Sequence, residues 1–144
     1  MFEENVATSR RLFEEAWNQG HVDVIDDVCS DGFVNHDPVL GDSDREAAKQ
    51  AIAGYRQAFP DLEITIEDIF AAGDKVAMRW TARGTFEGEI MGQQPTGEAG
   101  EPIGGIAIDR FEDGVMVESW AQWDTLRFLK NIGAVPEEAA AGTG

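Results

Sequence analysis

The sequence contains little cysteine and no long apolar segment. Cys29 is the only cysteine among the 144 residues, so no disulfide can form within the chain. It lies in a short apolar stretch away from any Cys-x-x-Cys arrangement, which indicates a small buried hydrophobe. No apolar run approaches the roughly 20 residues that span a bilayer, and the first residues, Met1-Phe2-Glu3-Glu4, are acidic where a signal peptide is basic. We therefore expect a cytoplasmic protein that does not bind membranes.

Positive charge is also scarce. The chain has 28 acidic and 11 basic residues, for a formal net charge of -17, and only three of the basic residues are lysines. Nucleic acids and anionic membranes require a positive protein surface, so we expect neither as a partner. The acidic residues are spread through every segment, which is typical of proteins that stay soluble in concentrated salt and predicts a halophilic protein. Attraction of a cationic substrate is the alternative, and it requires acidic residues gathered around one cleft.

Histidine is limited to His21 and His36, which argues against a metal site. His36 is followed by Asp37, but His21 is expected in a turn after the first helix, so no further histidine completes a ligand set. The sequence also lacks a phosphate-binding P-loop, a dinucleotide glycine fingerprint and a Ser-His-Asp order. We therefore expect neither a metal nor a cofactor.

The first half of the chain has the apolar spacing of helices. The elements predicted there are a helix over Glu3–Asn18, a shorter helix from Asp23 to about Asp31, a strand over Phe33–His36 and a third helix from Ser43 to about Ala58. Gly20 ends the first helix, and Asp37-Pro38 ends the strand. Ser43 is the expected N-cap of the third helix, with Glu46 completing a capping box.

The second half alternates between apolar and polar residues with period two, which predicts strands. The expected hairpins run through Leu62–Ile66 and Val76–Ala82, and through Ile103–Phe111 and Val115–Trp123. Asp124 is expected to cap a final helix that reaches Asn131. Helices followed by long antiparallel strands predict one two-layer α+β domain over residues 1–135, in which three N-terminal helices cover a curved sheet, with a flexible tail over residues 136–144.

Several segments together resemble the SnoaL-like branch of the NTF2-like superfamily in order and spacing. They are Asn35–Pro38, Phe59–Leu62, Gly73–Thr85, Pro95–Gly97, Asp109–Phe111, Glu118–Trp120 and Trp123-Asp124. The resemblance implies a cone-shaped fold with a pocket, assembled as a homodimer or homotetramer. It also implies polyketide cyclase chemistry, in which a ring closes by aldol condensation without metal or cofactor. Such cyclases use an aspartate on a late strand as acid and base, with a histidine and amide groups nearby.

The cyclase residues of that family do not carry over to this sequence. The resemblance places the catalytic aspartate at Ala121, and the histidine and glutamine of the preceding strand at Ala107 and Gly105. Alanine and glycine do not transfer protons. The family's usual cyclization chemistry is therefore not expected, and the activity has to be argued from the other residues of the pocket.

Asp109 is the first candidate for that chemistry. If Gly105 and Ala107 face the pocket, period two places Asp109 on the same face, with Ser119 and Trp123 opposite on the partner strand. An enclosed carboxylate is a stronger base than an exposed one, which suits proton transfer. The alternative is an ion pair of Asp109 with Arg79 or Arg110.

His36 and Asp37 are the other catalytic candidates, because the carboxylate of Asp37 is placed to orient the imidazole of His36. The alternative for His36 is a lining residue without a catalytic role. Trp80, Ser119 and Trp123 are predicted to bind the ligand, the tryptophans by stacking on a ring. The alternative for the tryptophans is packing in the core or at a subunit interface.

The opposite face of the sheet is predicted to carry an apolar patch of Ile106, Ile108 and Trp120, together with Gln122, which favours dimerisation. The long connection over residues 86–102 is expected to be either a lid or an ordered flap. The leading hypothesis is a cofactor-free enzyme that moves a proton on a small apolar carbonyl or ring compound, of the isomerase or cyclase type. The alternative is a non-catalytic domain that binds small molecules or another protein.

Overall fold

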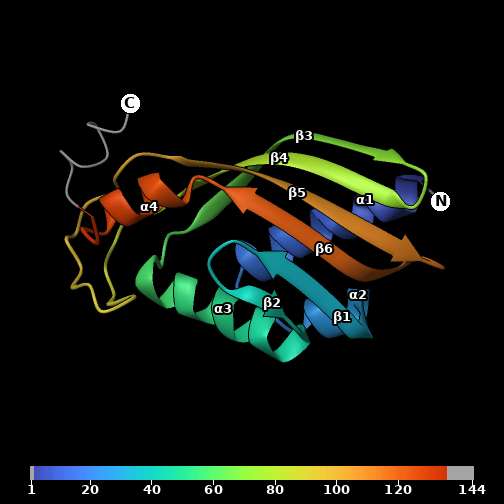
Figure 1. The fold of residues 1–144 in the computed structure, drawn as a ribbon, viewed down its shortest axis with the longest axis horizontal. Helices are drawn as coiled ribbons and strands as arrows, with labels where there is room; N and C mark the ends of the chain where they lie inside the picture. The colour runs from blue at the N-terminus through green and yellow to red at the C-terminus, as the bar shows by residue number, and fades with distance from the viewer. Residues whose placement is uncertain (1, 136–144) are drawn as a thin grey trace.

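Helices cover one face of a curved six-stranded sheet (Figure 1). The computed structural model describes residues 2–135. The helical elements are α1 (Phe2–Arg11), η1 (Leu12–Trp17), α2 (Val24–Val28), α3 (Arg45–Ala58) and α4 (Thr125–Asn131). The strands are β1 (Cys29–Asp37), β2 (Gly41–Ser43), β3 (Glu63–Ala72), β4 (Lys75–Arg83), β5 (Ile103–Glu112) and β6 (Val115–Trp123). The predicted two-layer α+β arrangement is confirmed, while the tail predicted over residues 136–144 lies outside the described residues.

The order of strands across the sheet is β2-β1-β6-β5-β4-β3. Both predicted hairpins, β3 with β4 and β5 with β6, are antiparallel as expected. β1 pairs in parallel with β6 and antiparallel with β2, a short strand that the sequence did not predict. α1 lies against β3 and β4, and α3 lies against β1 and β2, so the helices share one face of the sheet. We call the face toward the helices the inner face and the opposite one the outer face.

The first helix forms as predicted, but its second half is a π-helix instead of an α-helix. α1 is an α-helix to Arg11, and η1 continues it as a π-helix, in which Asn18 N donates to Phe13 O five residues back (3.0 Å). π-helical segments are rare in proteins, and those that occur are often found at functional sites. In η1 the π-helix carries four apolar side chains that pack into the core, namely Leu12, Phe13, Ala16 and Trp17.

The second helix is shorter than predicted because the first strand begins earlier. α2 ends at Val28, and Cys29 has extended backbone angles (φ -105°, ψ 145°). Cys29 is already paired with Met116 of β6, so the sheet takes up residues that the apolar spacing had assigned to the helix. The predicted strand over Phe33–His36 is therefore only the last part of β1.

The N-cap of α3 is Asp44, and the prediction of Ser43 is wrong. The Asp44 carboxylate accepts a hydrogen bond from Ala47 N (2.9 Å). Ser43 is buried, because it closes β2 by pairing with Asn35 of β1. Asp124 caps α4 as predicted and accepts from Arg127 N (3.1 Å).

The buried residues form two hydrophobic clusters. The larger cluster joins η1 and α2 to the middle of the sheet through Phe13, Ile25 and Met78. The smaller one joins α4 to the connection between β4 and β5 through Phe86 and Phe128. Trp123 packs against both clusters. Within residues 2–135, no helix is long and apolar enough to cross a membrane.

Candidate functional site

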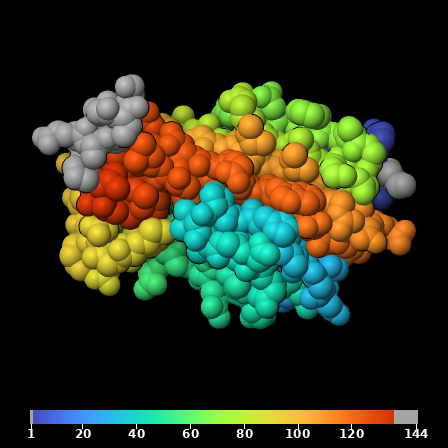
Figure 2. Space-filling view, in the orientation of Figure 1, coloured from blue at the N-terminus to red at the C-terminus, as the bar shows by residue number. Residues whose placement is uncertain are grey.

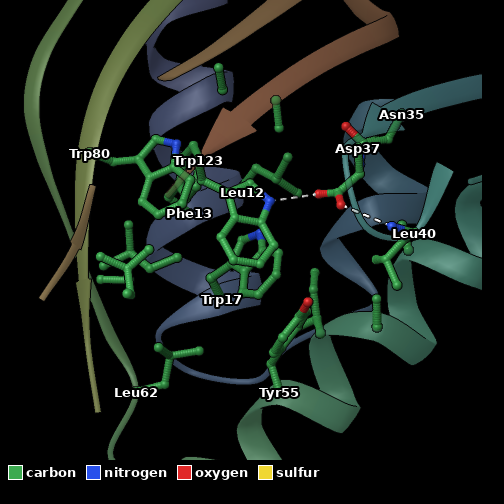
Figure 3. A pocket seen from close by; sticks show the side chains of 18 of the residues that line it. Leu12, Phe13, Trp17, Asn35, Asp37, Leu40, Tyr55, Leu62, Trp80 and Trp123 are labelled. Carbon is green, nitrogen blue, oxygen red and sulfur yellow. Dashed lines mark hydrogen bonds between the residues drawn. The ribbon is translucent and has the colours of Figure 1, made fainter. Parts of the chain in front are cut away.

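A cavity of about 180 Å³ lies between the inner face of the sheet and the helices η1, α3 and α4. Most of its lining is apolar or aromatic, and three tryptophans and a tyrosine surround it (Figure 3). These aromatic residues are Trp17, Tyr55, Trp80 and Trp123. The volume is close to the roughly 150 Å³ of an apolar cavity that accepts benzene, so the space suits a ligand of one or two rings.

Asp109 lines this cavity and is the most deeply buried charged residue of its lining, with 2% of its surface exposed. Its two carboxylate oxygens accept hydrogen bonds from Ser9 Oγ and Ser119 Oγ, each at 2.7 Å. Burial raises the pKa of Asp109, and the two serine hydroxyls offset only part of that rise. The nearby Cys29 thiol has its pKa raised to about 12 by burial and by the charge of Asp109, so it stays protonated and is a poor nucleophile.

Among residues 2–135 no cation forms an ion pair with Asp109, and the alternative of a bond to Arg79 or Arg110 is wrong. Arg79 is exposed and bonds Asp68 (2.8 Å), while Arg110 lies on the outer face and bonds Glu118 (3.2 Å). Both arginines follow the alternation of their strands away from the cavity. A buried carboxylate held only by hydroxyl groups is costly for the fold, which marks Asp109 as a candidate functional group.

Asp37 also lines the cavity, and its carboxylate bonds both the backbone that follows it and a lining tryptophan. One carboxylate oxygen accepts from the backbone N–H groups of Val39 (2.8 Å) and Leu40 (3.1 Å). The other accepts from the indole Nε1 of Trp123 at 3.1 Å, as the dashed line in Figure 3 marks. Asp37 therefore orients Trp123 and shapes the turn that brings Leu40 to the cavity.

His36 does not share the cavity with Asp37, and its expected position there is corrected. Alternation along β1 turns the two neighbouring side chains to opposite faces of the sheet. On the outer face the His36 ring stacks on Trp120 (centroids 5.6 Å apart) and bonds Asp42 (Nδ1–Oδ1 2.7 Å) and Glu118 (Nε2–Oε2 2.6 Å). These carboxylates raise the pKa of His36. The predicted role of Asp37 in orienting His36 is therefore corrected. Asp37 orients Trp123 instead, and Asp42 and Glu118 orient the imidazole of His36.

The three residues predicted to contact a ligand all line the cavity. Ser119 holds Asp109, Trp123 is held by Asp37, and the Trp80 ring packs against Phe13 with centroids 6.2 Å apart. Gly105 makes room for this ring, because a Cβ at position 105 would overlap the indole of Trp80. Trp80 thus covers the strand position to which the resemblance assigns the cyclase glutamine.

Sequence reasoning missed Ser9 and Tyr55. Ser9 lies on the apolar stripe of the first helix, one turn before Phe13, and a polar residue on such a stripe was the available signal. Tyr55 belongs to α3 and lines the cavity with the aromatic residues. Over residues 2–135, no group of three or more His, Cys, Asp or Glu side chains is arranged to hold a metal ion.

The connection over residues 86–102 contributes to the rim of the cavity and is tied down at several points. Phe86 is buried, and its backbone exchanges hydrogen bonds with Gly97 and Glu98 across the loop (2.8 and 2.9 Å). At its far end, Asn131 of α4 bonds the backbone of Glu101 twice (2.8 and 3.1 Å). Ala99 and Glu101 belong to the cavity lining.

Residues 7–132 match the family of SnoaL-like polyketide cyclases, which covers most of the chain and every element of the cavity. This chain belongs to the SnoaL-like family. The resemblance seen in the sequence is thereby confirmed, and its NTF2-like fold is the one that the structure has. No curated protein gives a significant match.

Solved structures of SnoaL-like proteins agree with this fold. AclR, a candidate hydroxylase from Streptomyces galilaeus, has a TM-score of 0.83 and 29% identity, covering 94% of this chain and 100% of its own. A candidate SnoaL-like polyketide cyclase from a Jannaschia species has a TM-score of 0.83 and 27% identity, covering 94% and 95%. IdmH, a candidate polyketide cyclase from Streptomyces antibioticus, has a TM-score of 0.78 and 30% identity, covering 90% and 98%. These neighbours carry different descriptions, so membership of the SnoaL-like family does not by itself fix the reaction.

Proposed function

We propose that this SnoaL-like protein is a cofactor-independent enzyme that transfers a proton on a small, largely apolar carbonyl or ring compound. The observation that carries the proposal is Asp109, a buried carboxylate in the lining of an aromatic cavity that, within the described part of the chain, is bonded by two hydroxyl groups and forms no ion pair. Such an environment raises the pKa of an acid toward the range in which it both takes and returns a proton.

Asp109 acts in this scheme as the base and then as the acid. Its carboxylate takes a proton from a carbon next to the carbonyl of the ligand, and the electron pair left behind moves to the carbonyl oxygen as an enolate. Return of the same proton to another carbon of the enolate system gives the isomer. Attack of the enolate carbon on a second carbonyl instead closes a ring, and the alkoxide formed on that carbonyl oxygen takes the proton back from Asp109. Ser9 and Ser119 hold the carboxylate in one orientation throughout.

The test uses 1-tetralone, a bicyclic ketone with exchangeable protons beside its carbonyl. We expect the protein in deuterated buffer to accelerate deuterium uptake into the ketone, measured by mass spectrometry, over the buffer alone. Asp109→Asn keeps the size of the side chain and removes the base, so the protein-dependent rate falls by about 100-fold or more. Asp42→Asn, which changes an exposed carboxylate on the outer face, is the matched control and keeps the rate. An unchanged rate in Asp109→Asn contradicts the proposal.

A non-catalytic binding protein is the second candidate, and one observation favours it. Ala107 and Ala121 are paired across β5 and β6 and both line the cavity, at the positions to which the resemblance assigns cyclase residues. This candidate predicts that 1-tetralone binds without any protein-dependent deuterium uptake, in the wild type as in Asp109→Asn. The same experiment therefore separates the two functions.

For the assembly we propose a homodimer that buries the outer face of the sheet. Ile106, Ile108 and Trp120 of neighbouring strands are all exposed there, and Figure 2 shows the side of the molecule on which β6 and β1 lie next to each other. Ile106→Glu is expected to shift the mass in sedimentation equilibrium to that of the monomer, whereas Ala53→Glu on the exposed side of α3 leaves it unchanged. A monomeric wild type contradicts the proposal.

The net charge of the chain bears on the proposed dimer and on the proposed partners. A formal charge of -17 on each copy makes two copies repel each other, so dimerisation is expected to strengthen as salt screens that repulsion. The same charge disfavours nucleic acids and anionic membranes as partners. We propose a cytoplasm of high salt content, which fits the first expectation, and sedimentation at low and molar salt measures it.

A further inference from the structure

A row of polar side chains crosses the inner face of the sheet on four neighbouring strands. Asp109 of β5 is paired with Ser119 of β6, and Ser119 is paired with Asn35 of β1. Asn35 is paired in turn with Ser43 of β2, the edge strand. All four residues line the cavity. Neighbouring strands lie about 4.8 Å apart, so the row runs for about 14 Å from the buried carboxylate to the edge of the sheet.

Asn35 and Ser43 form the outer half of the row, and their polar groups are open to water. Within residues 2–135, no donor or acceptor bonds the Asn35 amide or the Ser43 hydroxyl. Over the same residues, the unpartnered buried atoms that water cannot reach are Tyr55 Oη and Trp80 Nε1, so water does reach the two groups of the row. Ser43 is only 4% exposed, and native proteins leave few buried polar groups without a partner. Water is therefore the expected partner of both groups.

The spacing of the row fits one water molecule between successive side chains. Directly paired residues have Cβ atoms about 4.5–5.5 Å apart, and a water that bridges two polar atoms spans roughly 5.5 Å with its two hydrogen bonds. Ser119 Oγ donates to Asp109 Oδ1 (2.7 Å) and still has lone pairs with which to accept from such a water. The Asn35 amide both donates and accepts, so it can hold a water on either side.

The row opens to solvent at the edge of the sheet. Ser43 lines the cavity and also a second hollow, which lies where β2 meets the start of α3. The rest of that hollow is lined by Val34, Asp42, Asp44 and Ala47. Both of these aspartates are exposed. The other oxygen of Asp109 is bonded by Ser9, which is 0% exposed, so the Ser119 side is the one that leads to solvent.

We propose that Ser119, Asn35 and Ser43 hold a line of water that carries protons between Asp109 and the solvent at the β2 edge. In release, the protonated carboxyl of Asp109 gives its proton to Ser119 Oγ, and the hydroxyl gives its own proton to the first water. The excess proton passes along the water and leaves to buffer beyond Ser43, and uptake follows the same path in reverse. This inference rests on the proposed function only in that Asp109 is the group whose proton is exchanged. The path gives the base a route to solvent apart from the apolar part of the cavity, where a ligand lies.

The first test detects the water itself. In isotope-labelled protein in high salt, we expect a nuclear Overhauser effect between water and the side-chain amide of Asn35, with the sign of a bound water. Loss of the amide signals in Asn35→Leu identifies them. The absence of the effect in the wild type overturns the inference. Its disappearance on addition of 1-tetralone also overturns it, because the row then belongs to the ligand.

Variants test the connection to Asp109. Asn35→Leu keeps the size of the side chain and removes the amide that holds the water, while Ser43→Val fills the outer end of the row. Less water near the carboxylate disfavours its charged form, so each variant is expected to raise the pKa of Asp109, measured by carbon NMR titration of its carboxyl group, by about 0.5 or more. Thr65→Val removes a hydroxyl from an exposed position of β3 and, as the control, leaves that pKa unchanged. An unchanged pKa of Asp109 in either variant, with the fold shown intact by circular dichroism, contradicts the inference.

The deuterium experiment separates this inference from the proposed enzyme. If Asp109 is the base, Asn35→Leu is expected to slow deuterium uptake into 1-tetralone several-fold, because the proton that Asp109 takes returns to the ketone before it exchanges. No uptake by the wild type, together with a bound water and a shifted pKa, rejects the enzyme and keeps the path. Uptake by Asn35→Leu that is as fast as that of the wild type rejects the path and keeps the enzyme.

Discussion

The two faces of the sheet shift the pKa of a carboxyl group in opposite directions. On the inner face Asp109 is buried, forms no ion pair with any residue that the structure describes, and has a raised pKa because burial disfavours its charge. On the outer face Glu118 is half-buried, accepts from His36 and Arg110, and has a lowered pKa because those hydrogen bonds favour its charge. The two carboxylates belong to adjacent, paired strands.

This contrast is produced by alternation along single strands. Asp109 and Arg110 are neighbours in β5, as are Glu118 and Ser119 in β6, and in both cases one residue faces the cavity and the other faces outward. In these two strands the alternation places the guanidinium of Arg110 on the outer face and the hydroxyl of Ser119 on the inner face. The location of the chemistry thus follows from which face a residue occupies, and a shift of one position exchanges the two environments.

The largest effect on stability is expected from comparing two adjacent glycines, one on each face. A Cβ at Gly105 overlaps the Trp80 indole, whereas a Cβ at Gly104 meets no atom within 4 Å. Gly105→Ala is therefore expected to destabilise the fold by about 1–3 kcal/mol through overpacking, and Gly104→Ala to change it by less than about 0.5 kcal/mol. Urea unfolding in high salt measures both. Equal effects of the two changes contradict the assigned position of Trp80.

A smaller effect is expected from Asp109→Asn on the pH dependence of stability. The folded pKa of Asp109 lies above its ordinary value of 3.8, so between these two pKa values the folded state holds more protons than the unfolded state. The wild type therefore loses stability as pH rises from about 4 through the folded pKa. Asp109→Asn does not titrate, so its stability relative to the wild type is expected to rise with pH, and at neutral pH it is expected to be the more stable of the two.

Urea unfolding at several pH values between 4 and 8 checks this prediction, with the exposed Glu67→Gln as the control for the loss of one negative charge. A difference between wild type and Asp109→Asn that stays constant over that range means that burial does not shift the titration of Asp109. A wild type that gains stability over the variant as pH rises means that the pKa shift has the opposite sign.

The alternation of β5 and β6 could be read from the sequence. It placed Asp109, Ser119 and Trp123 on one face, and these residues line the cavity. The same rule applied to β1 also groups Phe33, Asn35 and Asp37 on the inner face and leaves His36 outside. The expectation for His36 failed because its neighbour Asp37 was taken as its partner, although adjacent residues of a strand face opposite sides.

Other features depend on contacts that a single sequence does not contain. Ser43 has the residue type of an N-cap, but its pairing with Asn35 places it in a strand and leaves the cap to Asp44. Likewise, the parallel pairing of β1 with β6 brings together segments far apart in the chain. The unpartnered hydroxyl of Tyr55 is recognisable only once the surrounding core is assembled, because every tyrosine on an apolar stripe has the same sequence signal.

The smallest effect is expected on the outer face, from His36→Gln. The folded pKa of His36 lies above its ordinary value of 6.5, so its bonds to Asp42 and Glu118 stabilise the fold fully below pH 6.5 and are lost as pH rises through the folded pKa. The pKa of Glu118 lies below its ordinary value of 4.5, so its contribution is present above pH 4.5 and declines as pH falls further.

The wild type is therefore expected to exceed His36→Gln in melting temperature most clearly between about pH 4.5 and 6.5, and to converge with it in alkaline buffer. The difference is smaller than those at Gly105 and Asp109, because these groups are reached by solvent and salt screens them. Repeating the melts in molar salt reduces it further, while the inner-face effect of Asp109→Asn persists, since no counter-ion reaches a buried group. If the difference in melting temperature between the wild type and His36→Gln depends on neither pH nor salt, His36 contributes through its stack on Trp120 and not through its charge.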